Sequence, residues 1–264
     1  MSSLLAIEWL KIKKYRTFWV LSIFFFALLP LWNIFIYKGF ISAGGKEMNF
    51  FAQSYSFPAI WGNFGFWASI FILFPSILMI ILTANEYGFR THRQNVIDGW
   101  SRLQSFHAKC LMVVVLALVS TIYMFITATI MGISVSGGTT FFTSEIEKVG
   151  YFFLLSLNYL GFAFFITTLI RKSGLSIGLF LLYALIIENM LKGILNWKLP
   201  VKVGNLLALQ ASDELLPFPF LKTAAAMISD TQPQIPDYGY VIATICWCVI
   251  YYVAGRAIIL RRDW

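Results

Sequence analysis

Residues 85–109 form the longest polar interruption in the first two-thirds of this 264-residue chain, and their side chains are candidates for catalysis or binding. The segment contains both histidines, two carboxylates and four cations: His92, His107, Glu86, Asp98, Arg90, Arg93, Arg102 and Lys109. The two histidines lie fifteen residues apart, with no thiolate or carboxylate at the spacing of metal ligands. The pattern therefore favours solvated or packed histidines over a metal site.

Catalytic motifs are missing from the rest of the chain as well. The dipeptide Gly45-Lys46 is followed by Glu47 and has Phe40 where the first glycine of a phosphate-binding loop belongs. Neither the H-E-x-x-H nor the G-x-S-x-G motif occurs. Cys246-x-Cys248 lacks the companion ligands of a metal site, and we expect inert, buried thiols. We expect no enzyme activity, metal or cofactor in this chain.

One carboxylate, Glu188, falls inside a predicted membrane span, where an ionisable side chain is costly and suggests a function. Lys192 follows four residues later, a spacing that lets the two side chains pair on one helix face. Glu188 is therefore either half of a structural ion pair or part of a substrate path. Asn158 and Asn189 could line the same path, or form hydrogen bonds between helices.

Composition assigns the chain to the polytopic α-helical membrane proteins. Its residues are 59% hydrophobic and only 12% charged, about half the charged fraction of a soluble domain. Several apolar runs reach the ~20 residues that a membrane-spanning helix needs. The formal charge of +8 is spread beside the ends of these runs, which is typical of membrane topology signals and argues against nucleic-acid binding.

The apolar runs predict one transmembrane domain of six helices, preceded by an interfacial helix. Residues 2–15 place apolar and lysine side chains on opposite faces, which favours a helix lying on the membrane, although a simple basic flank is the alternative. The predicted spans are about 17–37, 61–84, 110–135, 149–170, 175–195 and 238–260. Pro75 predicts a kink in the second span. Residues 196–237 form a long outer loop, in which 203–216 could form a short surface helix.

Six spans place both termini on one side of the membrane, and the basic residues indicate which side. That side carries four Lys or Arg residues before the first span, four in 85–109, two at 171–172 and three near the C-terminus, thirteen of the twenty in the chain. The excess predicts that both termini and the 85–109 segment are cytoplasmic. We expect a multi-pass membrane protein.

This layout resembles the type-2 ATP-binding-cassette (ABC) exporter permeases. Their segment after the second span carries a glutamate, a glycine with basic residues, a small-residue turn with Ser-Arg, and a lysine that opens the third span. The matching positions here are Glu86, Gly88, Arg90-Thr91, Arg93, Gly99, Ser101-Arg102 and Lys109. Phe89 and Trp100 depart from that pattern.

The resemblance implies that 85–109 is a cytoplasmic coupling helix that docks on a separate ABC ATPase, which binds ATP and Mg. Gly88 and Gly99 would permit the bends at its two ends. Its docking surface would comprise Arg90, Arg93, Val96, Ile97 and Trp100, with Glu86 and Arg102 flanking it. The other partners implied are a second copy or a sister permease, and membrane lipid.

Two alternatives to this interpretation remain open. The 85–109 segment could be only a basic topology signal. The chain could also be a non-transporting anchor or sensor that recruits a cytoplasmic partner for immunity or surface assembly.

Overall fold

The computed structural model describes residues 12–13, 15–38, 52–89, 99, 101–199, 202–218 and 235–261. Within these ranges the chain is all helical and contains no strand, which confirms the predicted fold class. Six long helical stretches are present. They are α2 (Arg16–Tyr37), α3 (Ile60–Phe71) followed by α4 (Leu73–Gly88), α6 (Arg102–Ser136), α7 (Glu147–Ile170), α8 (Ser173–Leu182) followed by a π-helix (Tyr183–Ile187) and α9 (Glu188–Lys198), and α12 (Asp237–Arg261).

All six stretches are long and apolar enough to cross a membrane, with mean hydropathies between 1.8 and 2.5. The chain is therefore a multi-pass membrane protein. The predicted interfacial helix, residues 2–15, lies almost wholly outside the described residues.

The second span is interrupted at Ile72, between α3 and α4. Pro75 lies in the first turn of α4 and has no backbone N–H to continue the hydrogen-bond ladder. Ser76 instead directs both its backbone N–H and its hydroxyl to the Ile72 carbonyl, at 3.0 and 2.9 Å. The break therefore lies one turn before the proline, as the steric conflict of a helical proline requires.

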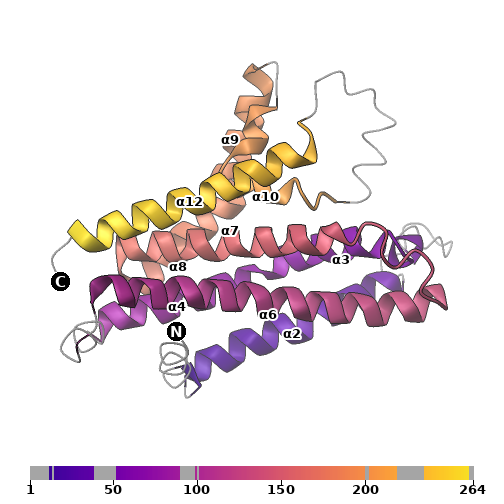
Figure 1. Cartoon of the computed structure of the whole chain (residues 1–264), viewed down its shortest axis with the longest axis horizontal. Coiled ribbons are helices and arrows are strands. Elements are labelled where there is room, and N and C mark those ends of the chain that lie inside the picture. The colour runs from indigo at the N-terminus through magenta and orange to yellow at the C-terminus, as the bar shows by residue number, and fades with distance from the viewer. Residues whose placement is uncertain are drawn as a thin grey trace.

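Helix α7 is the centre of the bundle (Figure 1). It packs against α3, α4, α6, α8 and α12, and 61% of its most apolar 18-residue stretch is buried. Small side chains, including Ser156 and Ala163, are completely buried and allow close packing of neighbouring helices. At the 136–147 end of the bundle, Trp61 stacks on Phe125 with 5.5 Å between ring centroids.

Helix α6 begins at Arg102, earlier than the apolar run that starts at 110. A capping box explains the difference: the Ser101 hydroxyl accepts from the Gln104 backbone N–H, and the Gln104 side chain accepts from the Ser101 N–H. The helix thus begins about two turns before its apolar part. Gly137, in the left-handed conformation at φ +66, ends it.

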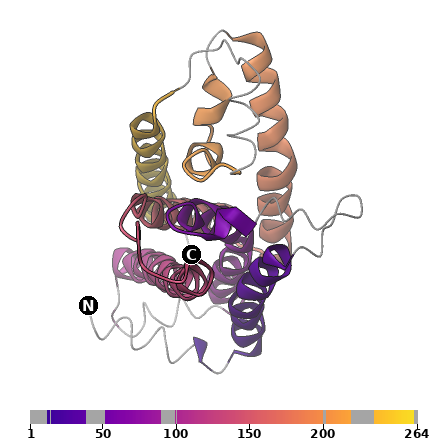
Figure 2. The same cartoon turned by 90° about the vertical axis from the view of Figure 1, so that its right-hand side faces the viewer.

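The chain between α9 and α12 folds back against the bundle. We call residues 203–216 the fold-back segment; it contains a 3-10 turn (Val203–Leu206) and a single turn of helix, α10 (Gln210–Asp213). Figures 1 and 2 show α9 reaching away from the layer of α6 and α7, with α10 between α9 and α12. The predicted surface helix over 203–216 is therefore wrong. Ala208, Leu209 and Ala211 are buried, because the polar groups of the segment bond to α7 and α9 instead of water.

Candidate functional site

Two polar regions of the structure contain the described site residues. At the end where α4 stops and α6 starts, the Glu86 carboxylate and the Lys109 ammonium form an ion pair at 2.8 Å. Their side chains are only 11% and 8% exposed. A charge-assisted contact in such a buried position holds α4 and α6 together where the predicted coupling segment begins and ends.

Two further contacts connect this end to the other helices. The Arg171 guanidinium lies over the Tyr87 ring, 5.0 Å from its centroid, and joins α4 to the turn between α7 and α8. His107 Nε2 lies 2.9 Å from the Tyr252 hydroxyl, which joins α6 to α12. These contacts connect the ends of α4 and α6 to the turn between α7 and α8 and to α12.

Four of the predicted coupling residues are described. Glu86 is buried, and Arg102 is the first residue of α6. Gly99 has φ +93, a conformation that favours glycine, whereas Gly88 is helical as the last residue of α4 and needs no glycine freedom. The proposed docking residues Arg90, Arg93, Val96, Ile97 and Trp100 lie outside the described residues.

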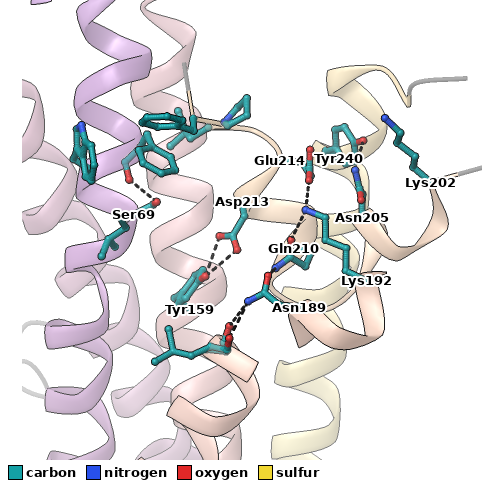
Figure 3. Close-up of a pocket in the computed structure, with 18 of the residues that line it drawn as sticks. Ser69, Tyr159, Asn189, Lys192, Lys202, Asn205, Gln210, Asp213, Glu214 and Tyr240 are labelled. Carbon is teal, nitrogen blue, oxygen red and sulfur yellow. Dashed lines mark hydrogen bonds and ion pairs between the residues drawn. The ribbon is translucent and has the colours of Figure 1, made fainter. Parts of the chain in front are cut away.

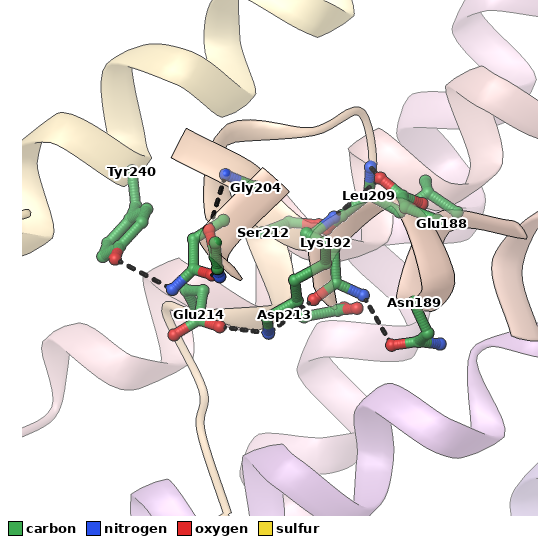
Figure 4. Close-up of polar contacts among 12 residues, drawn as sticks. Glu188, Asn189, Lys192, Gly204, Leu209, Ser212, Asp213, Glu214 and Tyr240 are labelled. Carbon is green, nitrogen blue, oxygen red and sulfur yellow. Dashed lines mark hydrogen bonds and ion pairs between the residues drawn. The ribbon is translucent and has the colours of Figure 1, made fainter. Parts of the chain in front are cut away.

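In the second polar region, Glu188 holds the fold-back segment against the middle of the bundle. Its Oε1 accepts hydrogen bonds from the backbone N–H groups of Leu209, at 2.6 Å, and Gln210, at 3.1 Å (Figure 4). The side chain of Glu188 is completely buried. Its carboxylate thus satisfies two backbone donors at the start of α10.

The predicted ion pair between Glu188 and Lys192 is not formed. Lys192 Nζ instead pairs with Glu214 Oε1 at 2.5 Å and donates to Gln210 Oε1 at 2.8 Å. Helical spacing permits the predicted pair, but the fold-back segment brings a carboxylate and an amide of its own to the lysine.

The asparagines singled out in the sequence also bind this segment. Asn158 Nδ2 donates to the Ala208 carbonyl at 2.7 Å and to Ser212 Oγ at 3.0 Å. Asn189 Oδ1 accepts from Gln210 Nε2 at 3.1 Å. Asn158, Glu188 and Asn189 thus all bind the fold-back segment, through its backbone and its side chains.

Four polar side chains of the fold-back segment were not predicted as site residues: Gln210, Ser212, Asp213 and Glu214. The Tyr159 hydroxyl donates to both carboxylate oxygens of Asp213, at 2.9 and 3.0 Å. The signal that could have found them is the run QASDE, which is polar between the apolar runs 206–209 and 215–216. Such a run is unusual unless each polar group has a partner.

A cavity of about 760 Å³ lies between the fold-back segment, α3, α9 and the start of α12 (Figure 3). Its polar wall includes Tyr159, Asn189, Lys192, Asp213 and Glu214. Its apolar wall includes Phe66, Trp67, Ile70, Leu73 and Leu185. Apolar walls with a few convergent polar groups are typical of small-molecule sites.

Burial raises the pKa of the Asp213 carboxyl to about 7. The Tyr159 hydrogen bond and the Lys192 charge lower this pKa, whereas the charges of Glu188 and Glu214 raise it. The desolvation of the carboxylate dominates. Asp213 therefore changes its charge near neutral pH.

Among the described residues, no group of three or more His, Cys, Asp or Glu side chains is placed to hold a metal ion. Cys110, Cys246 and Cys248 are free thiols; Cys246 is exposed and the other two are partly buried, so Cys246 and Cys248 are less buried than expected.

Comparison with known protein families gives one match. The model of a family described as "ABC-2 family transporter protein" matches residues 4–187, which is more than half of the chain. No curated protein sequence matches this chain. The matched range contains both ends of the 85–109 segment and ends next to Glu188, so it leaves out the fold-back segment and α12.

Proposed function

Because the chain belongs to the ABC-2 family of transporter proteins, we propose that it is the permease subunit of an ATP-driven exporter. Two membrane subunits, either two copies or this chain and a sister permease, pair and couple to two separate ABC ATPase subunits. Members of this family are membrane components of transport and work with an ABC ATPase. The exporter lies in the bacterial cytoplasmic membrane with both termini in the cytoplasm, as the excess of basic residues on that side favours.

The observation that carries this proposal is the buried ion pair between Glu86 and Lys109. It joins the last turn of α4 to the first turns of α6, on either side of the segment proposed to dock on the ATPase. An ATPase that moves the segment would displace both helices as one body. A loop that served only as a topology signal would not need this connection.

The proposed movement reaches the fold-back segment through α7. Helix α7 packs against α4 and α6, and its Asn158 and Tyr159 bind the fold-back segment. ATPase closure would therefore change the walls of the cavity beside this segment. ATP and Mg bind to the ATPase subunit, and this chain supplies the path and the docking surface.

The proposal is tested by purifying the chain with its candidate ATPase and measuring binding and ATP turnover in membranes. We expect the charge reversal Arg90→Glu with Arg93→Glu to reduce ATPase binding by at least about tenfold. Lys198→Glu is the matched control, because Lys198 is a cation at the last residue of α9, outside the proposed docking segment. Unchanged binding and turnover in the double variant would refute the docking role.

The orientation has a separate test in a cysteine-free background. Phe89 is 73% exposed directly after α4, so Phe89→Cys should react with an impermeant thiol reagent only in inside-out vesicles. Reaction in right-side-out cells would contradict the cytoplasmic assignment. ATPase binding without any cargo-dependent turnover would instead favour the anchor or sensor function.

A further inference from the structure

The cavity beside the fold-back segment is bordered by exposed apolar side chains of the second and fifth spans. Ile70 on α3 and Leu185 in the π-helix both border the cavity, and they are 44% and 57% exposed. Both belong to helical stretches that are long and apolar enough to cross a membrane. Exposed apolar side chains at this position contact acyl chains, so this side forms the opening of the cavity toward the lipid bilayer.

The inner walls combine aromatic and charged groups. Phe66, Trp67 and Phe218 form an aromatic cluster, with 4.9 Å between the ring centroids of Phe66 and Phe218 and 5.1 Å between those of Phe66 and Trp67. Lys192 and Lys202 line the cavity together with three carboxylates, Asp213, Glu214 and Asp237. The cavity therefore offers an apolar surface at its opening and charges of both signs farther in.

Asp213 is the carboxylate best placed for a cationic ligand. Glu214 is neutralised by Lys192 at 2.5 Å. Among the described residues, the Asp213 carboxylate accepts hydrogen bonds only from the neutral Tyr159 hydroxyl, and it forms no ion pair with them. A desolvated carboxylate that has no such ion-pair partner is strongly stabilised by an ammonium group.

We propose that this cavity binds a zwitterionic aminophospholipid from the surrounding bilayer, with its ammonium group at Asp213 and its phosphate at Lys192 and Lys202. The acyl chains leave past the aromatic cluster through the opening between Ile70 and Leu185. The volume of about 760 Å³ is within the range of ligand sites and accommodates a head group with the first part of the chains.

The charges in the cavity favour an aminophospholipid over anionic and choline phospholipids. An anionic lipid without an ammonium group would bring its phosphate near Asp213, Glu214 and Asp237 with nothing to compensate Asp213. A choline head group has no N–H to donate to the carboxylate, and therefore binds more weakly. The proposed orientation of the permease would make the outer leaflet the source of this lipid, whereas the binding itself does not depend on that orientation.

Native mass spectrometry of the full-length protein in detergent tests the proposal, with palmitoyl-oleoyl phosphatidylethanolamine as the probe. We expect Asp213→Asn to weaken its binding by at least about tenfold, because the ionic contact is lost while the side-chain shape is kept. Glu145→Gln is the matched control, since Glu145 pairs with Lys148 at the same end of the bundle but outside the cavity. Ser69→Trp, which fills the cavity from α3, should abolish binding by a different route.

Two further probes distinguish the source of the ligand. Palmitoyl-oleoyl phosphatidylglycerol should bind at least about tenfold more weakly, and free phosphoethanolamine should not compete at equal concentration. Equal binding of both lipids, or unchanged binding to the Asp213→Asn and Ser69→Trp variants, would overturn the proposal. Full competition by free phosphoethanolamine would overturn the lipid as the ligand. None of these measurements needs an ATPase, so a failure here leaves the proposed permease function standing.

Discussion

Disruption of the buried ion pair between Glu86 and Lys109 gives the sharpest test of how α4 and α6 are held together. The charged atoms lie 2.8 Å apart and the side chains are 11% and 8% exposed. Removing one partner of a buried pair costs about 3–5 kcal/mol, because the other charge stays desolvated. The remaining exposure lets water reach the pair. We therefore expect Lys109→Met or Glu86→Gln alone to lower the free energy of unfolding by about 2–3 kcal/mol.

The double variant separates pairing from simple loss of packing. In the variant that carries both substitutions no charge remains buried, so its loss should be smaller than the sum of the two single losses by about 1–2 kcal/mol. The wild type, the two single variants and the double variant form a double-mutant cycle. Equilibrium unfolding in mixed micelles measures the free energy of unfolding of all four proteins. ATP turnover with the partner ATPase, measured on the same proteins, should fall in parallel in the single variants.

A second pair provides the control for this cycle. Lys148 and Glu145 form an ion pair whose side chains are 26% and 43% exposed. The corresponding cycle with Lys148→Met and Glu145→Gln should show a coupling below about 1 kcal/mol. Strictly additive losses for Glu86 and Lys109, or an equal coupling in both cycles, would refute the inference that burial makes this pair the connection between α4 and α6.

Three further predictions concern the fold-back segment and the packing of α6. Burial raises the pKa of Asp213 in the folded protein to about 7, so the folded protein holds this proton more tightly than the unfolded chain does. The stability should therefore fall as the pH rises from about 4 to about 7. Asp213→Asn should reduce this pH dependence of the thermal midpoint. Glu188→Ala removes the acceptor of two backbone donors and should raise the rate of proteolysis within the fold-back segment at least about tenfold, while Glu188→Gln, which keeps an acceptor oxygen, should have a smaller effect; equal rates would contradict the role of Glu188 as its anchor. Gly132→Ala would place a Cβ 2.5 Å from the Phe57 ring and should lower the thermal midpoint by several degrees, whereas Gly178→Ala, with nothing within 4 Å, should not lower it; equal midpoints would contradict the close packing at Gly132.

The helical membrane fold and the family were predictable from local sequence. Apolar runs of membrane length are set by the thickness of the hydrocarbon layer, so composition alone indicates six spanning helices. The break near Pro75 and the left-handed turn at Gly99 follow from the backbone limits of proline and glycine. The resemblance carried by the 85–109 segment is confirmed by the family match over residues 4–187.

The partners of the buried charges could not be predicted in the same way. Glu188 and Lys192 stand four residues apart and could pair on any isolated helix, yet each bonds to residues about twenty positions away. Sequence by itself determined which segments enter the membrane, because that depends on the transfer of each segment from water to lipid. Only the tertiary structure decided that 203–216 is buried and forms one wall of a cavity, because its polar groups are satisfied by Asn158, Tyr159 and Glu188, which are brought to it by the packing of α7 and α9.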